Sequence, residues 1–315
     1  MAPSLMLLDS ASLYYRAFYG VPDRFTSVSG TPTNAIRGFL DMVAQLVERF
    51  EPEGLVACWD DDWRPQFRVD LIPSYKAHRV EEAADESASG TNKSSDLEEE
   101  EMPDSLSVQE PVIAEVLAAI GIPVVGAEGF EADDVIAQLA RDHDGPVLIV
   151  TGDRDLFQLV DDGRDVRVLY TARGLAKLGV VNEEWVREKY FVSAQLYADF
   201  ALLRGDASDG LPGVTGVGDK TAAKLVNEFG GINSIVAAAV RDGSTIAPRV
   251  RTNIIAAQDY LSRADPVVRL NHSVPVPEGP FPLVHQPAEQ KKLNLIISEQ
   301  RISRPVERLL NCLQG

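Results

Sequence analysis

Cysteine and long apolar runs are both scarce in this sequence. The chain of 315 residues contains two cysteines, Cys58 and Cys312, too few for a disulfide framework or a cysteine-ligated zinc site. Cys58 lies within an apolar run, where a buried free thiol is expected. The sequence has no apolar stretch of about 18 residues and no N-terminal signal-peptide pattern. We therefore expect a chain without membrane partners that works in a reducing cytoplasm.

Histidine is also scarce, and positive charge is in deficit. The four histidines lie in polar segments, so none is expected to act as a general base. The net charge of −18 by itself argues against a nucleic-acid partner. However, residues 81–104 contain ten acidic residues and one lysine, and nine further carboxylates gather in short motifs. These two groups account for the whole excess, so the acidity is local and leaves room for a DNA-binding face.

Three apolar runs each end at or just before an aspartate. These aspartates are Asp9, Asp60 and Asp153, which follow residues 4–8, 54–59 and 147–150. Apolar runs of this length, bounded by turn residues, are typical of buried parallel strands. In open parallel sheets, ligands lie beyond the carboxyl ends of the strands. The pattern therefore predicts an α/β fold in which the three aspartates meet at one edge of a parallel sheet.

More carboxylates lie beside the third of these strand ends. Glu131, Asp133 and Asp134 open an expected helix in the motif GFEADD, and Asp155 follows Asp153 in TGDRD. Carboxylates held together raise one another's pKa, so a group this dense needs cations. Hard divalent ions prefer oxygen ligands, which matches motifs that contain neither histidine nor cysteine. The motifs therefore predict a site for Mg²⁺ or Mn²⁺.

A glycine-rich segment downstream predicts a phosphate-binding hairpin. The sequence GDASDGLPGVTGVGDKT spans residues 205–221, and its glycines permit a tight turn before a helix that carries Lys220 and Lys224. Free backbone N–H groups at such a turn and helix start bind phosphate without reading the sequence of bases. An ordinary turn between helices is the alternative. The acidic pair Asp206 and Asp209, just upstream, favours the functional interpretation.

Each acid also has an ordinary structural explanation. Glu131 and Asp134 could favour a helix N-terminus, at about 0.3–1 kcal/mol each. Asp206 and Asp209 could be turn and N-cap residues. Asp9 alone would more often be a strand-end residue than a ligand. It is the convergence of several such residues on one sheet edge that favours a metal site.

Five ordered blocks of the sequence resemble one known family. The blocks are GTPTNAIRGF (30–39), YKAHR (75–79), GFEADDVIAQLA (129–140), TGDRDLFQLV (151–160) and GDASDGLPGVTGVGDKTAAKL (205–225). In this order and spacing they resemble the flap endonuclease and 5′→3′ exonuclease family, which includes the 5′-nuclease domain of bacterial DNA polymerase I. The resemblance runs from Leu5 to about Leu270. No polymerase region follows, so we expect a stand-alone relative.

The resemblance implies a particular α/β architecture. A Rossmann-like (PIN-like), mostly parallel central sheet would carry a helical arch and a helix-three-turn-helix DNA-binding region. The nuclease core is expected over residues 1–190, with the arch at about 76–111 and an acidic insertion at 81–104. The DNA-binding region is expected over 191–275. Residues 276–315 would pack back on the core or lie at its periphery.

The resemblance also implies roles for individual residues. Four carboxylates would bind the first metal ion, namely Asp9, Asp60, Glu131 and Asp133. The second cluster would be Asp153, Asp155, Asp206 and Asp209, with Asp134 shared or in the outer shell. Lys76 and Arg79 match catalytic basic residues at the base of the arch, which touch the scissile phosphate. DNA contacts are expected from Arg16 and from Gly213, Val214, Gly216, Gly218, Lys220, Thr221 and Lys224.

The implied function is a structure-specific 5′-nuclease that acts on DNA with 5′ flaps, nicks, gaps or 5′ ends. Two or three Mg²⁺ or Mn²⁺ ions would activate water and neutralise charge, leaving a 5′-phosphate and a 3′-hydroxyl. In relatives the hairpin can also hold a K⁺ ion. A monomer at the nucleoid is expected, with DNA polymerase, ligase and clamp as functional partners in replication and repair.

The sequence departs from the family pattern in its arch, where the acidic run Asp96–Glu101 replaces basic or apolar residues. An acidic arch would repel a threaded strand without changing the chemistry below it. Two other classes stay open. One is a non-catalytic binder of DNA junctions, and the other is a phosphatase or ribonuclease on a related α/β sheet. Asp9-Ser10-Ala11 lacks the second aspartate of the phosphatase nucleophile motif, which argues against a phosphatase.

Overall fold

The computed structural model describes residues 4–77 and 103–314. Its centre is a six-stranded sheet in the order β3-β2-β1-β4-β5-β6, in which the first five strands are parallel and β6 is antiparallel to β5. The strands are β1 (Leu5–Asp9), β2 (Gly54–Cys58), β3 (Val124–Val125), β4 (Val147–Thr151), β5 (Val166–Tyr170) and β6 (Gly179–Val181). The predicted mostly parallel α/β sheet is confirmed.

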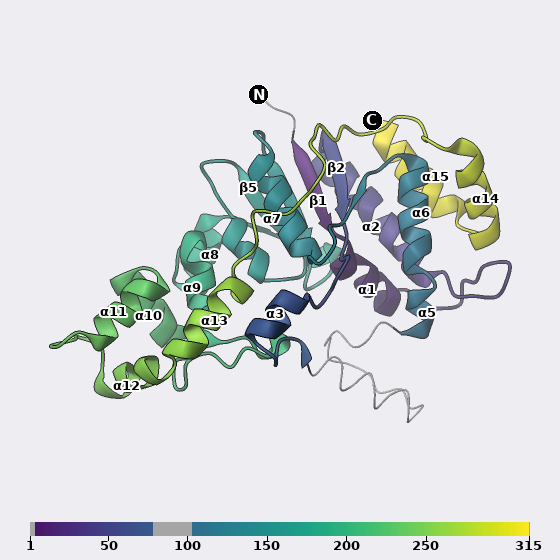
Figure 1. Cartoon of the computed structure of the whole chain (residues 1–315). Helices are drawn as coiled ribbons and strands as arrows, with labels where there is room; N and C mark the ends of the chain where they lie inside the picture. Colours follow the sequence, from purple (N-terminus) through teal and green to yellow (C-terminus); the bar gives the residue numbers. More distant parts are fainter. Residues whose placement is uncertain (1–3, 78–102, 315) are drawn as a thin grey trace.

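Helices cover both faces of this sheet because its central strands are apolar on both sides (Figure 1). Met6 and Leu8 of β1 pack in one core, and Leu5 and Leu7 pack in the other. Over the first face lie α1 (Ser10–Gly20), α2 (Asn34–Phe50), α6 (Glu110–Ile120), α14 (Gln290–Gln300) and α15 (Ser303–Gln314). Over the second lie α3 (Gln66–Leu71), α7 (Ala132–Asp142), α8 (Glu183–Tyr190) and α9 (Tyr197–Arg204).

A group of helices extends from the second face, at the lower left of Figure 1. It contains α10 (Asp219–Phe229), α11 (Ile232–Val240), α12 (Pro248–Ala256) and α13 (Gln258–Val268). Helix α9 joins this group to the sheet, since it packs against both α10 and α13. The short helices are α5 (Asp104–Ser107), η1 (Asp155–Leu159), η2 (Leu175–Lys177), η3 (Ala194–Leu196) and η4 (Ala207–Asp209).

The chain then returns from α13 across the sheet to the first face. Its backbone joins the start of β2, where Leu55 N–H donates to Phe281 O (3.1 Å) and Leu283 N–H donates to Glu53 O (3.0 Å). Helix α14 packs on α6, and α15 packs on α2. Among the described residues, no helix combines the length and the apolar character needed to cross a bilayer.

Candidate functional site

A cavity of about 590 Å³ lies at the carboxyl edge of the sheet. Asp9 is the last residue of β1, while Asp60 and Asp153 lie two residues beyond the ends of β2 and β4. All three line the cavity, together with Glu131 and Asp133. The structure therefore brings the three predicted strand-end aspartates together with two carboxylates from the start of α7.

Asp9 is held in place from two sides. Its Oδ1 accepts a hydrogen bond from Ser12 N–H (3.1 Å), which caps helix α1, and its Oδ2 accepts one from the Thr151 hydroxyl (2.6 Å). The Thr151 hydroxyl oxygen in turn accepts a hydrogen bond from Asp153 N–H (2.8 Å). Thr151 thus fixes the ends of β1 and β4 relative to each other. A carboxylate that is 6% exposed is pre-positioned in this way before any ligand arrives.

Glu131 is bonded by three side chains at the cavity wall. It accepts hydrogen bonds from Arg68 Nη1 (2.8 Å) and Tyr75 OH (2.7 Å), and it pairs with Lys76 Nζ. Burial alone would raise the pKa of Glu131, but the charges of Lys76 and Arg68 hold that pKa below its usual value. Glu131 therefore stays ionised and fixes Lys76 at the cavity wall.

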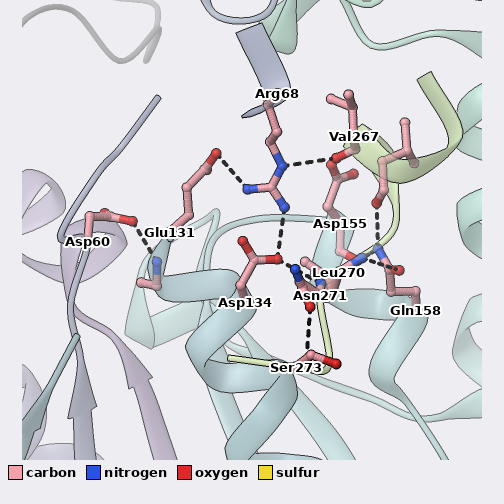
Figure 2. A network of polar contacts seen from close by, with 12 residues as sticks. Asp60, Arg68, Glu131, Asp134, Asp155, Gln158, Val267, Leu270, Asn271 and Ser273 are labelled. Carbon is pink, nitrogen blue, oxygen red and sulfur yellow. Dashed lines mark hydrogen bonds and ion pairs between the residues drawn. The ribbon is translucent and has the colours of Figure 1, made fainter. Parts of the chain in front are cut away.

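The structure places Asp134 away from the cavity. Its Oδ1 accepts hydrogen bonds from Arg68 Nη2 and from Asn271 N–H, both at 2.8 Å, and the residue is fully buried (Figure 2). Asp134 was expected to be shared between the ions or to lie in the outer shell; its contact with Arg68, which also bonds Glu131, fits the outer-shell alternative, and the role stays a prediction. Helical rotation explains the position of Asp134: Asp133 and Asp134 are about 100° apart around α7, so only Asp133 faces the cavity.

Of the second predicted cluster, only Asp153 lines the cavity, while Asp155, Asp206 and Asp209 are not among its lining residues. Burial, followed by the charges of Asp153, Asp209 and Asp206, raises the pKa of Asp155 well above its ordinary value. These four carboxylates therefore lie within electrostatic reach of one another. Asp206 Oδ2 also accepts hydrogen bonds from Arg154 and Arg204, each at 3.2 Å.

The donor set of the cavity fits a hydrated hard cation. Burial, followed by the charges of Asp153, Asp9 and Glu131, raises the pKa of Asp133 well above its ordinary value. Within residues 4–77 and 103–314, no three histidine, cysteine, aspartate or glutamate side chains are arranged to hold one ion by themselves. Mg²⁺ suits such a site because it keeps several waters and binds through one or two carboxylates.

The raised pKa values predict how divalent cations stabilise the fold. Asp133 and Asp155 bind protons more tightly folded than unfolded, so the metal-free protein should lose stability as pH rises above the ordinary aspartate value of about 4. Divalent ions compete with those protons, so Mg²⁺ or Mn²⁺ should raise Tm more at about pH 8 than at about pH 5.5. Thermal melts with chelator, with each ion, and with NaCl at equal ionic strength measure this. A Tm increase independent of pH would contradict the prediction.

The predicted basic residues differ in what the structure describes. Lys76 lines the cavity in a left-handed backbone conformation (φ 49°), which is rare for a residue with a side chain. Its N–H donates to Asp209 O (3.0 Å), and its Nζ donates to Trp63 O (3.2 Å) as well as to Glu131. Arg79, the acidic insertion and most of the expected arch lie outside the described residues.

Arg16 projects from α1 into the cavity. Its Nε is buried and has no hydrogen-bond partner among the described residues. Burial lowers the pKa of Arg16 from its usual value, partly offset by Tyr170. A buried guanidinium N–H without an acceptor is costly unless an anion binds there. This arrangement fits the predicted phosphate contact.

The glycine-rich segment forms a turn between α9 and α10. Gly213 and Gly216 have positive φ values of 65° and 75°, and Gly218 is the N-cap of α10. The N–H groups of Gly216 and Gly218 have no acceptor within the described part of the chain, and both residues are exposed. Val214 differs, because its side chain is buried and its N–H donates to Leu203 O (2.9 Å). It anchors the turn rather than presenting a group to a ligand.

The remaining predicted residues of this region lie on α10. Lys220 and Lys224 are exposed, and Thr221 is half-buried with its N–H bonded to Gly218 O (3.0 Å). Two lysines one helical turn apart beside exposed N–H groups form a compact cationic surface. The backbone of the turn and the two lysines are thus placed to bind phosphate.

Several arginines and a glutamine contact the site although the sequence did not single them out. They are Arg68, Arg154, Arg204 and Gln158. Arg154 lies between two candidate ligands in TGDRD, and that adjacency was a usable signal. Arg68 had none, because its carboxylate partners follow it by 63 and 66 residues.

The sheet and its cavity define an α/β protein in which carboxylates gather beside Arg16 and Lys76 at the carboxyl edge of the sheet. Comparison with known proteins gives the family. A family described as 5′-3′ exonuclease, N-terminal resolvase-like domain, matches residues 4–191, and 5′-3′ exonuclease, C-terminal SAM fold, matches residues 192–291. The chain belongs to the 5′-3′ exonuclease family.

Relatives of similar length come from two bacteria. A 5′-3′ exonuclease of Streptomyces coelicolor is 51% identical over 308 residues, covering 98% of this chain and 99% of the relative. A 5′-3′ exonuclease of Mycobacterium tuberculosis is 49% identical over 294 residues, covering 90% of each chain. DNA polymerase I of Mycobacterium bovis is 37% identical across 99% of this chain, which spans only 32% of that polymerase.

Solved structures share the fold at low sequence identity. The T5 D15 protein co-crystallised with metal ions aligns with a TM-score of 0.64 at 17% identity, covering 98% of this chain and 99% of that chain. The catalytic core of Rad2 in complex with DNA substrate aligns with a TM-score of 0.57 at 16% identity, covering 99% and 92%. These likenesses support the architecture of the sheet and its helices.

Proposed function

We propose that this protein is a structure-specific DNA 5′-nuclease, acting as a flap endonuclease and a 5′→3′ exonuclease. The observation that carries the proposal is the cavity in which five carboxylates face Arg16 and Lys76. Cations and a phosphate diester would both find partners there, within one cavity. The exonuclease names of relatives at about half identity support the same activity.

The chain's own residues would bind and orient the scissile phosphate. The carboxylates would hold Mg²⁺ or Mn²⁺, which when bound would supply an activated water and neutralise charge on the phosphoryl oxygens. Arg16, with its buried unpaired N–H, would hold a non-bridging phosphate oxygen. Lys76 is fixed by Glu131 and by the backbone of Asp209, so its charge needs no reorganisation as negative charge develops. Cleavage would leave a 5′-phosphate and a 3′-hydroxyl.

The turn at Gly213–Gly218 and helix α10 would grip the duplex next to the cleaved strand. Contacts to phosphates carry no base sequence, so recognition would rest on the shape of a flap, nick, gap or 5′ end. The turn is joined to the cavity by the short loop that carries Asp206 and Asp209. The proposed duplex contacts and two of the candidate ligands are therefore on one continuous segment.

Removal of the α10 cations should weaken DNA binding and its salt dependence. Changing Lys220 and Lys224 together to alanine should reduce the slope of log affinity against log salt by up to about 2 and weaken binding uniformly across sequences. Fluorescence anisotropy with Ca²⁺ and flap DNA at several salt concentrations measures this. The matched control changes Lys291 and Lys292 on α14, a helix that does not line the cavity. An unchanged slope in the α10 variant would remove these lysines from the interface.

Cleavage of a labelled substrate tests the proposed function directly. A DNA duplex with a 5′ flap, incubated with Mg²⁺ or Mn²⁺, should be cut near the junction, and a blunt duplex should lose nucleotides from its 5′ end. An RNA flap of the same sequence separates a deoxyribonuclease from a ribonuclease. If the folded protein bound the DNA flap but cut neither substrate with either ion, a non-catalytic junction binder would be the better assignment.

A further inference from the structure

Two polar side chains, Arg68 and Gln158, bond the chain that leaves the helical region. We call this pair of side chains the clasp. Residues 267–271 run from the end of α13 past α7 and η1 (Figure 2). Arg68 and Gln158 each bond this return segment on one side and a carboxylate residue on the other. The two side chains come from α3 and η1, and both are buried or half-buried.

Arg68 joins three elements through one guanidinium group. Its Nη1 donates to Glu131 (2.8 Å), its Nη2 to Asp134 (2.8 Å) and its Nε to Val267 O at the end of α13 (3.3 Å). The residue is 2% exposed, so it cannot contact DNA directly. Asp134 also accepts from Asn271 N–H (2.8 Å), which ties the same return segment to α7. Arg68 thus links the position of α13 to the carboxylate of Glu131.

Gln158 makes the corresponding connection to the second cluster. Its Nε2 donates to Asp155 O (2.9 Å) and to Val268 O (3.2 Å), and its Oε1 accepts from Leu270 N–H (3.2 Å). The backbone of Asp155 and the end of α13 therefore share one uncharged side chain. Gln158 does not line the cavity, and it bears no charge that could act on a ligand there.

The other end of α13 is bonded to the glycine-rich turn. Gly213 N–H donates to the hydroxyl of Tyr260 on α13 (3.1 Å). Asn253 of α12 donates through Nδ2 to Thr215 O (2.8 Å). A continuous set of contacts thus runs from the turn, through Tyr260 and α13, to Arg68 and Gln158 and on to the two carboxylate clusters.

We propose that Arg68 and Gln158 are positioning residues that make the alignment of the carboxylates depend on how the helical region is docked. This inference rests on the proposed function. A duplex held by the turn would fix the position of α13. Through the clasp, it would also fix the positions of Glu131 and Asp155. A single strand that does not engage the turn would lack this contribution. The clasp would therefore raise turnover on junction substrates without adding a contact to DNA.

The test compares two substrates in single-turnover cleavage with Mg²⁺. One is a 5′-flap duplex, and the other is a single strand of the same sequence as the flap. Gln158→Met keeps the side-chain volume and removes the hydrogen bonds. It should lower the flap rate about tenfold, leave the single-strand rate within about twofold, and leave flap affinity in Ca²⁺ unchanged. Arg68→Lys keeps the charge but loses the planar guanidinium that bonds two carboxylates at once. It should lower the ratio of the flap rate to the single-strand rate.

The matched control is Gln138→Met on α7. Gln138 also bonds the returning chain, accepting from Val274 N–H (3.1 Å), and its side-chain amide donates to Asp142, which is not a candidate ligand. It should lower Tm without changing the ratio of the two rates. If Gln158→Met lowered the flap rate and the single-strand rate by the same factor, the clasp would have only a structural role. That result would overturn the inference.

Tyr260→Phe keeps the inference falsifiable if the clasp variants fold poorly. Loss of its hydroxyl should lower the flap rate selectively, and combining it with Gln158→Met should cost less than the product of the separate effects. Independent effects that multiply would contradict the proposed connection. If the unmodified protein cut neither substrate, the proposed function would fall first, and this inference with it.

Discussion

Asp153→Ala should abolish most cleavage while sparing DNA binding. Asp153 lines the cavity, and its charge raises the pKa of both Asp133 and Asp155, so it stands between the two carboxylate clusters. Its loss removes a group that both predicted ion sites would use. We expect the single-turnover rate on a flap substrate to fall by about 10²- to 10³-fold or more. Flap affinity should stay the same or rise slightly, because a negative charge near the phosphate disappears.

Rate and affinity must be measured separately to interpret this variant. Cleavage is followed at saturating enzyme with Mg²⁺ and Mn²⁺, and affinity by anisotropy in Ca²⁺. Asp144→Ala removes the same charge from an exposed position just before β4, at the opposite edge of the sheet. That control should keep its full rate. If Asp153→Ala retained turnover close to that of the control, Asp153 would have no place in the site.

Gly210→Ala should disable the site through the backbone. Gly210 has φ 69°, and a Cβ there would lie 1.9 Å from Ser74 O. The loop would have to move away from the backbone of residues 74–76. It would then lose the Ser74 hydroxyl bond to Gly210 O (2.8 Å) and the Lys76 N–H bond to Asp209 O (3.0 Å). Because a displacement of about 1 Å can cost about 100-fold in rate, we expect a loss of that size.

A second glycine separates this clash from the cost of the backbone conformation alone. Gly243 has φ 72°, and a Cβ there would meet no atom within 4 Å. Gly243→Ala should therefore cost only the left-handed conformation, about 1–2 kcal/mol of stability, and keep full activity. Thermal melts and single-turnover rates on both variants make the comparison. Equal rates in the two variants would show that contact between this loop and Ser74 is dispensable.

The sheet was predictable because the sequences of buried parallel strands are unbroken apolar runs. Residues 54–58 and 147–151 needed no long-range information to be recognised, and their polar ends marked the ligand edge. Strands β3 and β6 were not predicted, since two and three residues are too short to show a period. Their place depends on the neighbouring strand rather than on local sequence.

Predicting the site was limited by partners that lie far apart in sequence. The motif GFEADD shows three acids, but it does not show which of them faces the cavity. That depends on the rotation of α7, which turns Asp134 toward Arg68, a residue 66 positions upstream on α3. Asp206 likewise carries no local sign that Arg154 will reach it from η1's N-terminus. Local motifs identified the acids, whereas the basic residues that orient them emerged only from the fold.

The distribution of the site along the chain has a consequence during synthesis. The central strand pair joins Leu5–Leu8 to Val147–Val150, and the last candidate ligand is Asp209. Since chains emerge from the ribosome with the N-terminus first, no nascent chain shorter than about two thirds of the sequence can contain the complete site. A shorter copy of this protein lacks at least one candidate ligand, so the proposed capacity to cut DNA arises only when most of the molecule exists.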